Sequence, residues 1–145
     1  MPPDLPRAEL IEAFKATSYV VYTGETEITL RIGQTSPELD ALLEQRHAST
    51  WTFITAYNPD AETVSAEQNQ AAMAQFKKDL AAAGLDFLEA AGVPDRSRGP
   101  EREPEPSLLI IGVTRDDAIA FGRNYDQVAI VVGKAHEAAE LVMLE

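Results

Sequence analysis

The sequence contains no cysteine and only two histidines in 145 residues. Without cysteine the chain forms no disulfide bond, and it offers neither a thiolate nucleophile nor a cysteine-ligated zinc site. His47 and His136 lie far apart in the sequence and show no spacing typical of metal ligands. We therefore expect no metal site, and we expect both histidines to be ordinary polar residues at the surface.

Glycine-rich motifs are missing as well. The eight glycines are scattered, and none belongs to a GxxxxGKS/T, GxGxxG or GxSxG pattern. These patterns mark phosphate-binding loops, dinucleotide-binding turns and nucleophile elbows. The sequence therefore offers no motif for a cofactor, and we expect none.

Positive charge is scarce, because 12 lysine and arginine residues stand against 24 aspartate and glutamate residues, a net charge of −12. This balance argues against broad binding of nucleic acid, which needs clustered positive charge. It is compatible with an acidic surface that occupies a basic protein partner, although acidic surfaces also serve solubility alone.

Long hydrophobic runs are absent. The strongest runs, residues 108–113 and 128–133, reach about a third of the length of a membrane-spanning helix and have the length of buried strands. The first residues show no basic segment followed by an apolar stretch, so no signal peptide is predicted. We therefore expect a cytoplasmic protein that does not enter a membrane.

The apolar pattern predicts an α+β (mixed α/β) fold. Helical spacing and capping residues predict helices over residues 7–16, 37–47 and 65–83, and a fourth after Thr114. Apolar runs and alternation predict strands at residues 19–22, 27–32, 51–57, 85–89, 107–113, 127–132 and 140–144. An early hairpin followed by strand–helix–strand units indicates a single layer of mixed β-sheet with about four helices packed on it.

At this length we expect one domain, residues 1–145. Residues 94–106 contain four of the nine prolines and no aliphatic or aromatic side chain to bury. Such a composition is typical of a flexible loop. The loop is either a solvated connector or a lid over a site, and the sequence leaves both open.

Polar residues stand where predicted strands end or helices begin: Asn58 after a strand, Asn69 in the first turn of the third helix, and Gln127 before a strand. Buried amides must find hydrogen-bond partners. These amides either cap loops by bonding to backbone, or converge with Tyr57 and Ser107 on a ligand-binding pocket beside the strand ends. Glu105, next to a buried strand, is the best candidate for a catalytic acid or base, because an apolar environment raises the pKa of a carboxyl group.

The order of these segments resembles a bacterial family, domain-of-unknown-function family 3293. The resemblance covers roughly residues 19–132 and rests on Tyr19 and Tyr22, the run Thr-Ala-Tyr-Asn-Pro at residues 55–59, Ser65 with Asn69, the run Glu-Pro-Ser at residues 105–107, and Gln127. Asp126 and Val128 depart from the pattern, which has a glycine and a polar residue there. The resemblance implies no reaction, cofactor or partner.

Three functions remain open. A non-catalytic binding or accessory protein is the leading hypothesis, because the residues assemble no nucleophile–base pair, metal cluster or phosphate loop. An enzyme acting on a small polar or nucleotide-like molecule is the second, with Glu105 as acid or base and the amides as orienting groups. The third is an acidic interaction protein. A pocket lined by the amides would favour the enzyme, and carboxylates gathered on one face would favour the interaction protein.

Overall fold

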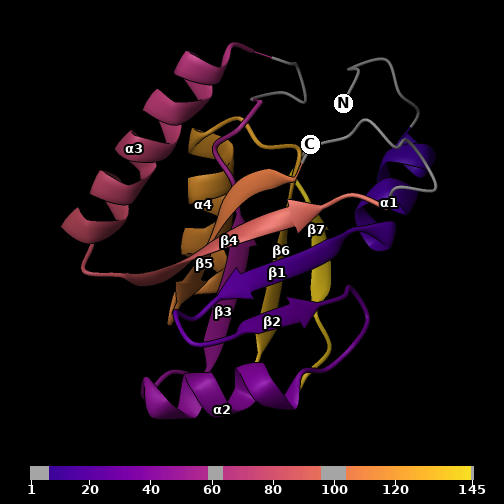
Figure 1. Ribbon diagram of the computed structural model, residues 1–145, viewed down its shortest axis with the longest axis vertical. Coiled ribbons are helices and arrows are strands. Elements are labelled where there is room, and N and C mark those ends of the chain that lie inside the picture. Colours follow the sequence, from indigo (N-terminus) through magenta and orange to yellow (C-terminus); the bar gives the residue numbers. More distant parts are fainter. Residues whose placement is uncertain (1–6, 59–63, 96–103, 145) are drawn as a thin grey trace.

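Seven strands form one curled sheet, flanked by four helices, in the part of the chain that the structure describes (Figure 1). This computed structural model describes residues 7–58, 64–95 and 104–144. The helices are α1 (Arg7–Ala16), α2 (Pro37–Gln45), α3 (Ala66–Ala82) and α4 (Arg115–Asn124). The strands are β1 (Ser18–Tyr22), β2 (Glu27–Leu30), β3 (Thr50–Ile54), β4 (Asp86–Val93), β5 (Glu105–Ile111), β6 (Ala129–Lys134) and β7 (Glu140–Met143). The predicted α+β class with four helices is confirmed.

Three of the helices begin at the capping residues that the sequence predicts. Ser36, Ser65 and Thr114 each accept a hydrogen bond from a backbone N–H in the first turn of their helix. Ser65 and Gln68 complete a capping box, because each side chain bonds the backbone of the other residue. A cap satisfies N–H groups that have no partner within the helix, so the local sequence alone indicates where these helices start.

The strand order is β2-β1-β4-β5-β3-β6-β7, and every pair of neighbouring strands is antiparallel. This corrects the expectation of a mixed sheet. Helix α3 connects β3 to β4, and these two strands do run parallel, but β5 lies between them. Helix α4 connects β5 to β6, and these two strands are likewise separated by β3. Each helical connection therefore skips one strand, and the inserted strand makes both pairings antiparallel.

The two edges of the sheet approach each other beyond β2 and before β7. Ile32 and Ala139 form an isolated parallel bridge. The N–H of Gly33 donates to the carbonyl of Ala139 at 2.8 Å, and the N–H of Ala139 donates to the carbonyl of Gln34 at 3.0 Å. These bonds tie the edges together at one end, so the sheet curls into a half-barrel.

The core consists of two clusters on opposite faces of this sheet. The inner cluster lies within the curl and is covered at one end by α2 (Figure 1); it includes Val21, Leu39, Leu43, Phe53 and Leu109. The outer cluster lies under α3 and α4 and includes Phe76, Leu80, Leu108, Ile110 and Ala118. Successive residues of β5 alternate between the clusters, because neighbouring side chains of a strand point to opposite faces.

Several strand boundaries differ from the prediction. β3 ends at Ile54 rather than at residue 57, and β4 is longer than predicted. β5 begins at Glu105, so Glu105 and Pro106 belong to a strand and not to the predicted loop. They pair with Gly92 and Ala91 of β4, and no local sequence pattern predicts this pairing. Residues 96–103 of the predicted loop lie outside the described residues.

Candidate functional site

Two asparagines from separate elements bind each other. The backbone N–H of Asn58 donates to Oδ1 of Asn69 at 2.8 Å, and Nδ2 of Asn69 donates to Oδ1 of Asn58 at 3.0 Å. Oδ1 of Asn58 also accepts the N–H of Val64 at 3.3 Å. Asn58 has φ 48, a left-handed conformation that asparagine adopts more readily than most residues. The pair therefore fixes the turn after β3 to the first turn of α3.

Asn58 extends this pair to Glu105. The side chain of Asn58 lies close enough to Glu105 to lower the pKa of its carboxyl through a hydrogen bond. Because a carboxylate only accepts hydrogen bonds, Nδ2 of Asn58 is the donor. Burial raises the pKa of Glu105 to about 7, and the hydrogen bond from Asn58 acts in the opposite direction. Asn58, Asn69 and Glu105, which the sequence singled out separately, thus form one chain of contacts.

Gln127 anchors backbone instead of facing the carboxylate. Its Nε2 donates to the carbonyl of Tyr57 at 3.1 Å and to the carbonyl of Tyr125 at 3.2 Å. The ring of Tyr57 packs against the outer cluster. For Gln127 the structure therefore shows the backbone-bonding alternative, in which the amide connects the turn after β3 to the segment after α4.

Ser107 is buried on the inner face of the sheet, with 2% of its surface exposed. Its hydroxyl donates to the backbone carbonyl of Glu105 at 3.0 Å. This hydrogen bond stays within β5 and engages the hydroxyl proton of Ser107 with the backbone of Glu105.

Tyr19 and Gly92 also lie beside Glu105. Tyr19 of β1 pairs with Gly92 of β4, and Gly92 pairs with Glu105 of β5. The Tyr19 hydroxyl donates to the carbonyl of Phe14 at 2.7 Å. Burial raises the pKa of that hydroxyl above its usual value. A hydrogen bond with Thr17 and the charge of Arg31 oppose this effect, and the Glu105 charge adds to it. In the sequence, Tyr19 stands out only through the family resemblance, and Gly92 does not stand out, because strand register is not visible locally.

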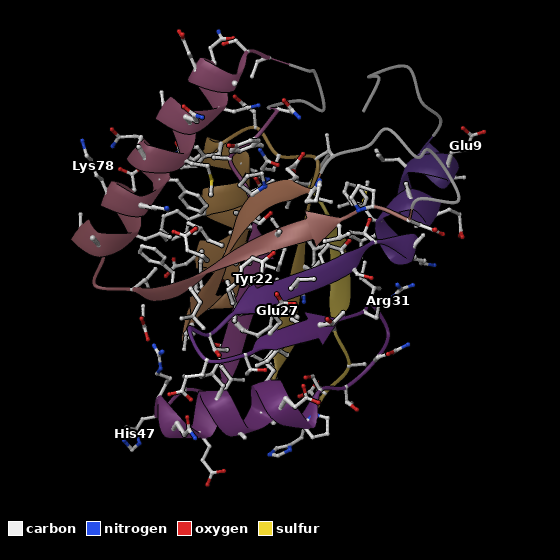
Figure 2. All side chains as sticks on the ribbon, in the orientation of Figure 1. Glu9, Tyr22, Glu27, Arg31, His47 and Lys78 are labelled. Carbon is white, nitrogen blue, oxygen red and sulfur yellow. The ribbon has the colours of Figure 1, made fainter. Side chains whose placement is uncertain are left out.

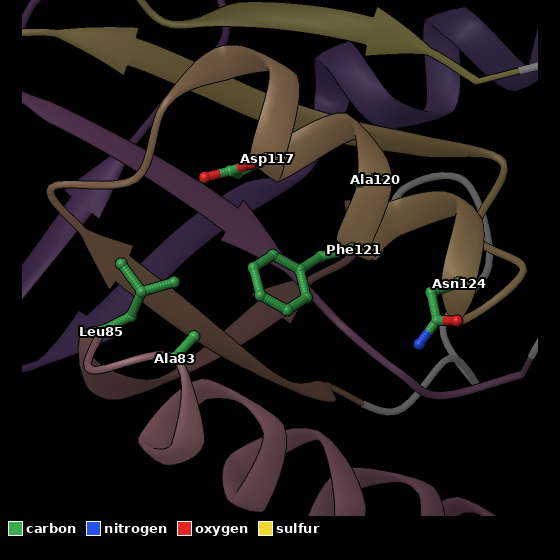
Figure 3. Close-up of a pocket in the computed structure, with 6 residues that line it drawn as sticks. All are labelled: Ala83, Leu85, Asp117, Ala120, Phe121 and Asn124. Atoms are coloured by element: carbon green, nitrogen blue, oxygen red, sulfur yellow. The ribbon is translucent and has the colours of Figure 1, made fainter.

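A pocket of about 440 Å³ lies elsewhere, between the end of α3 and α4 (Figure 3). An apolar floor with a carboxylate and an amide lines it, from Ala83, Leu85, Asp117, Ala120, Phe121 and Asn124. None of the residues predicted for the site lines this pocket. It is therefore separate from the contacts around Glu105.

Neither a cluster of metal-ligand side chains nor a membrane-spanning helix is found in the described part of the chain. It contains no group of three or more histidine, aspartate or glutamate side chains that could hold a metal ion. His136 lies with Nδ1 3.4 Å from Oδ2 of Asp40, and His47 is exposed beyond the end of α2 (Figure 2). No described helix is long and apolar enough to cross a membrane.

The family described as "Protein of unknown function (DUF3293)" matches residues 54–130, a little over half of the chain. None of the curated proteins matches the sequence. Among solved structures, a phage SAM lyase in complex with S-methyl-5'-thioadenosine is similar over 66% of this chain and 88% of its own, with 17% identity and a TM-score of 0.36. A likeness of this degree supports no conclusion about this chain.

Proposed function

The chain belongs to the DUF3293 family of proteins of unknown function, and we propose that it binds a small polar ligand without catalysis. The binding residues in this proposal are Tyr19, Asn58 and Glu105, here called the Glu105 site. Asn69 holds Asn58, and Ser107 bonds to the backbone of Glu105. Gln127 donates to the backbone carbonyl of Tyr57 and so holds the turn after β3.

One observation carries this proposal: a largely desolvated carboxyl group is held in place by an asparagine that is itself held by a second asparagine. Burying an ionisable group costs stability, so such groups are concentrated at functional sites. An amide chain that only capped loops would not need a carboxyl at its end. The arrangement therefore suits a ligand that donates hydrogen bonds to the Glu105 carboxyl.

The test is a thermal-shift screen of the full chain against small polar metabolites, including nucleosides, amino acids and amines. A ligand at about 100 times its Kd adds about 2.7 kcal/mol of stability, which raises Tm by several degrees. We expect at least one compound to raise Tm, and we expect Glu105→Gln to abolish that rise. Glu27→Gln is the matched control, since Glu27 is an exposed carboxylate of β2. A screen without hits, or hits that survive Glu105→Gln, would contradict the proposal.

An enzyme acting on a small polar molecule is the second candidate. It is favoured by the pKa of about 7 at Glu105, because a general acid or base works best when its pKa lies near the operating pH. The adjacent Ser107 hydroxyl donates to backbone, so it is not activated as a nucleophile by Glu105. Incubating each screening hit with the protein and following the compound by NMR separates the two candidates. Turnover that Glu105→Gln removes would favour the enzyme.

No comparable observation favours an acidic interaction surface. Exposed carboxylates stand on many elements of the described chain, including Glu9 on α1, Glu27 on β2, Glu38 on α2, Glu67 on α3 and Asp116 on α4. Figure 2 shows Glu9 and Glu27 well apart. We also propose the bacterial cytoplasm as the compartment, which fractionation of cells would test.

A further inference from the structure

Three neighbouring strands place Tyr19, Gly92 and Glu105 in one row across the sheet. Tyr19 pairs with Gly92, and Gly92 pairs with Glu105. Residues directly opposite each other send their side chains to the same face of a sheet. The ring of Tyr19 and the carboxyl of Glu105 therefore flank a position with no side chain, with their Cα atoms about 10 Å apart, twice the strand spacing.

Among the residues that the structure describes, the position above Gly92 has room for at least a methyl group. A Cβ added at Gly92 would meet a single atom within 4 Å, Cγ2 of Thr17 at 3.8 Å, which is ordinary van der Waals contact. The backbone at Gly92 is not left-handed, so the strand does not require glycine for conformational reasons. Glycine inside a strand weakens it, and it often marks a place where a ligand approaches the backbone.

The groups around this space differ in accessibility and chemistry. Gly92 and Glu105 are half-buried, whereas Tyr19 is 5% exposed and packs edge-on against Phe53 with ring centroids 4.9 Å apart. The Tyr19 hydroxyl is committed to the carbonyl of Phe14, so the tyrosine offers an aromatic wall and not a free hydroxyl. The side chain of Asn58 is a hydrogen-bonding neighbour of the Glu105 carboxyl.

We propose that this row recognises a flat cation, an amidinium or guanidinium group of the ligand, that lies over Gly92 and donates to Glu105. A carboxylate accepts two parallel N–H bonds from such a group, and an aromatic wall favours a flat cation over an anion. The net charge of −12 attracts cations to the whole molecule. This inference rests on the proposed function and names its ligand class.

The experiment is an amide NMR titration of the full chain with benzamidine, and with benzamide and benzoate as neutral and anionic compounds of the same shape. We expect benzamidine to shift the signals of Gly92 and Glu105. We expect benzamide and benzoate to bind at least about tenfold more weakly, as the loss of a charge-assisted pair implies. Equal binding of the three compounds would overturn the inference. Shifts confined to Asp117 and Phe121 would also overturn it, because they would place the cation in the pocket beside α4.

Two variants make the test specific to the row. Gly92→Ala should fold and melt at or above the wild-type temperature, because a Cβ fits there, yet it should weaken benzamidine about tenfold or more by filling the space. Glu105→Gln should abolish the preference for benzamidine over benzamide. Tyr22→Phe is the control, because Tyr22 lies on β1, the strand of Tyr19, and is 41% exposed. Unchanged benzamidine affinity in Gly92→Ala would refute the inference.

The failure of this inference differs from the failure of the proposed function. If benzamidine does not bind but another metabolite stabilises the protein in a Glu105-dependent way, the ligand class is wrong and the site stands. If no compound of any kind depends on Glu105, both are wrong.

Discussion

Asn69 and Asn58 are bound to each other by two hydrogen bonds, of 2.8 and 3.0 Å, although eleven positions separate them in the chain. One bond satisfies the backbone N–H of Asn58. The other occupies Oδ1 of Asn58, so that its Nδ2 is the group available to Glu105. Asn69 is 6% exposed and itself contacts no carboxylate in any described hydrogen bond. Its connection to Glu105 therefore runs through Asn58.

Replacing Asn69 by leucine should destabilise the protein. Asn69→Leu keeps the approximate volume but leaves the N–H of Asn58 without its acceptor, so the free energy of unfolding should fall by about 1–3 kcal/mol. Urea unfolding measures this loss. Gln70→Leu, at the neighbouring exposed position of α3, should change stability by less than about 0.5 kcal/mol. Equal effects of both variants would mean that the asparagine pair does not hold the turn.

The half-buried Glu105, with its raised pKa, should make stability depend on pH. Its pKa is about 7 in the folded chain, against 4.5 without burial, so the folded state binds the proton more tightly. The stabilisation is complete below pH 4.5 and is lost as pH rises through 7, by as much as about 3 kcal/mol.

Glu105→Gln isolates this effect. The difference in unfolding free energy between wild type and Glu105→Gln should fall between pH 4.5 and pH 7 and stay level above, as measured by urea unfolding at each pH. Glu27→Gln, at an exposed position of β2, is the control for the substitution itself. A difference that rises with pH would contradict the burial of the carboxyl.

The centre of the sheet should be sensitive to truncation. Ile110 of β5 and Ile130 of β6 are 0% and 2% exposed, both in the outer cluster. Ile110→Ala and Ile130→Ala should each lower the free energy of unfolding by about 2–5 kcal/mol, because each leaves a cavity. Urea unfolding provides the measurement, with the half-buried Val20→Ala as a milder comparison. Losses below about 1 kcal/mol at both isoleucines would be incompatible with this core.

Two glycines of the sheet should respond in opposite ways to the same substitution. Gly133 pairs with Trp51, and a Cβ at Gly133 would overlap the indole ring. Gly133→Ala should therefore destabilise by about 1–3 kcal/mol, whereas Gly92→Ala should be neutral or stabilising. Thermal unfolding of the two variants side by side checks this. Loss of stability in Gly92→Ala comparable to that in Gly133→Ala would show that a Cβ does not fit at Gly92.

Local signals account for the elements that the sequence predicted well. Capping residues such as Ser65 and Thr114 determine helix starts through bonds to the next three residues, so they are readable without the fold. The early hairpin is equally local, with Tyr19 paired to Leu30 across a short turn. The predicted strand at residues 107–113 begins later than β5 does, because the first residues of β5 are extended by pairing with β4 and not by an apolar pattern of their own.

The sequence by itself determined the helices, most of the strands, the α+β class and the polar residues worth following. Each of these depends on contacts within a few positions of the chain or on side-chain chemistry. Only the tertiary structure decided that the sheet is antiparallel, that Asn58 joins Asn69 to Glu105, and that Gly92 separates Tyr19 from Glu105. These depend on strand order and register, which are set by pairings between distant segments: Gly92 lies 73 positions from Tyr19 and 13 from Glu105, yet the ladder brings all three within two strand spacings.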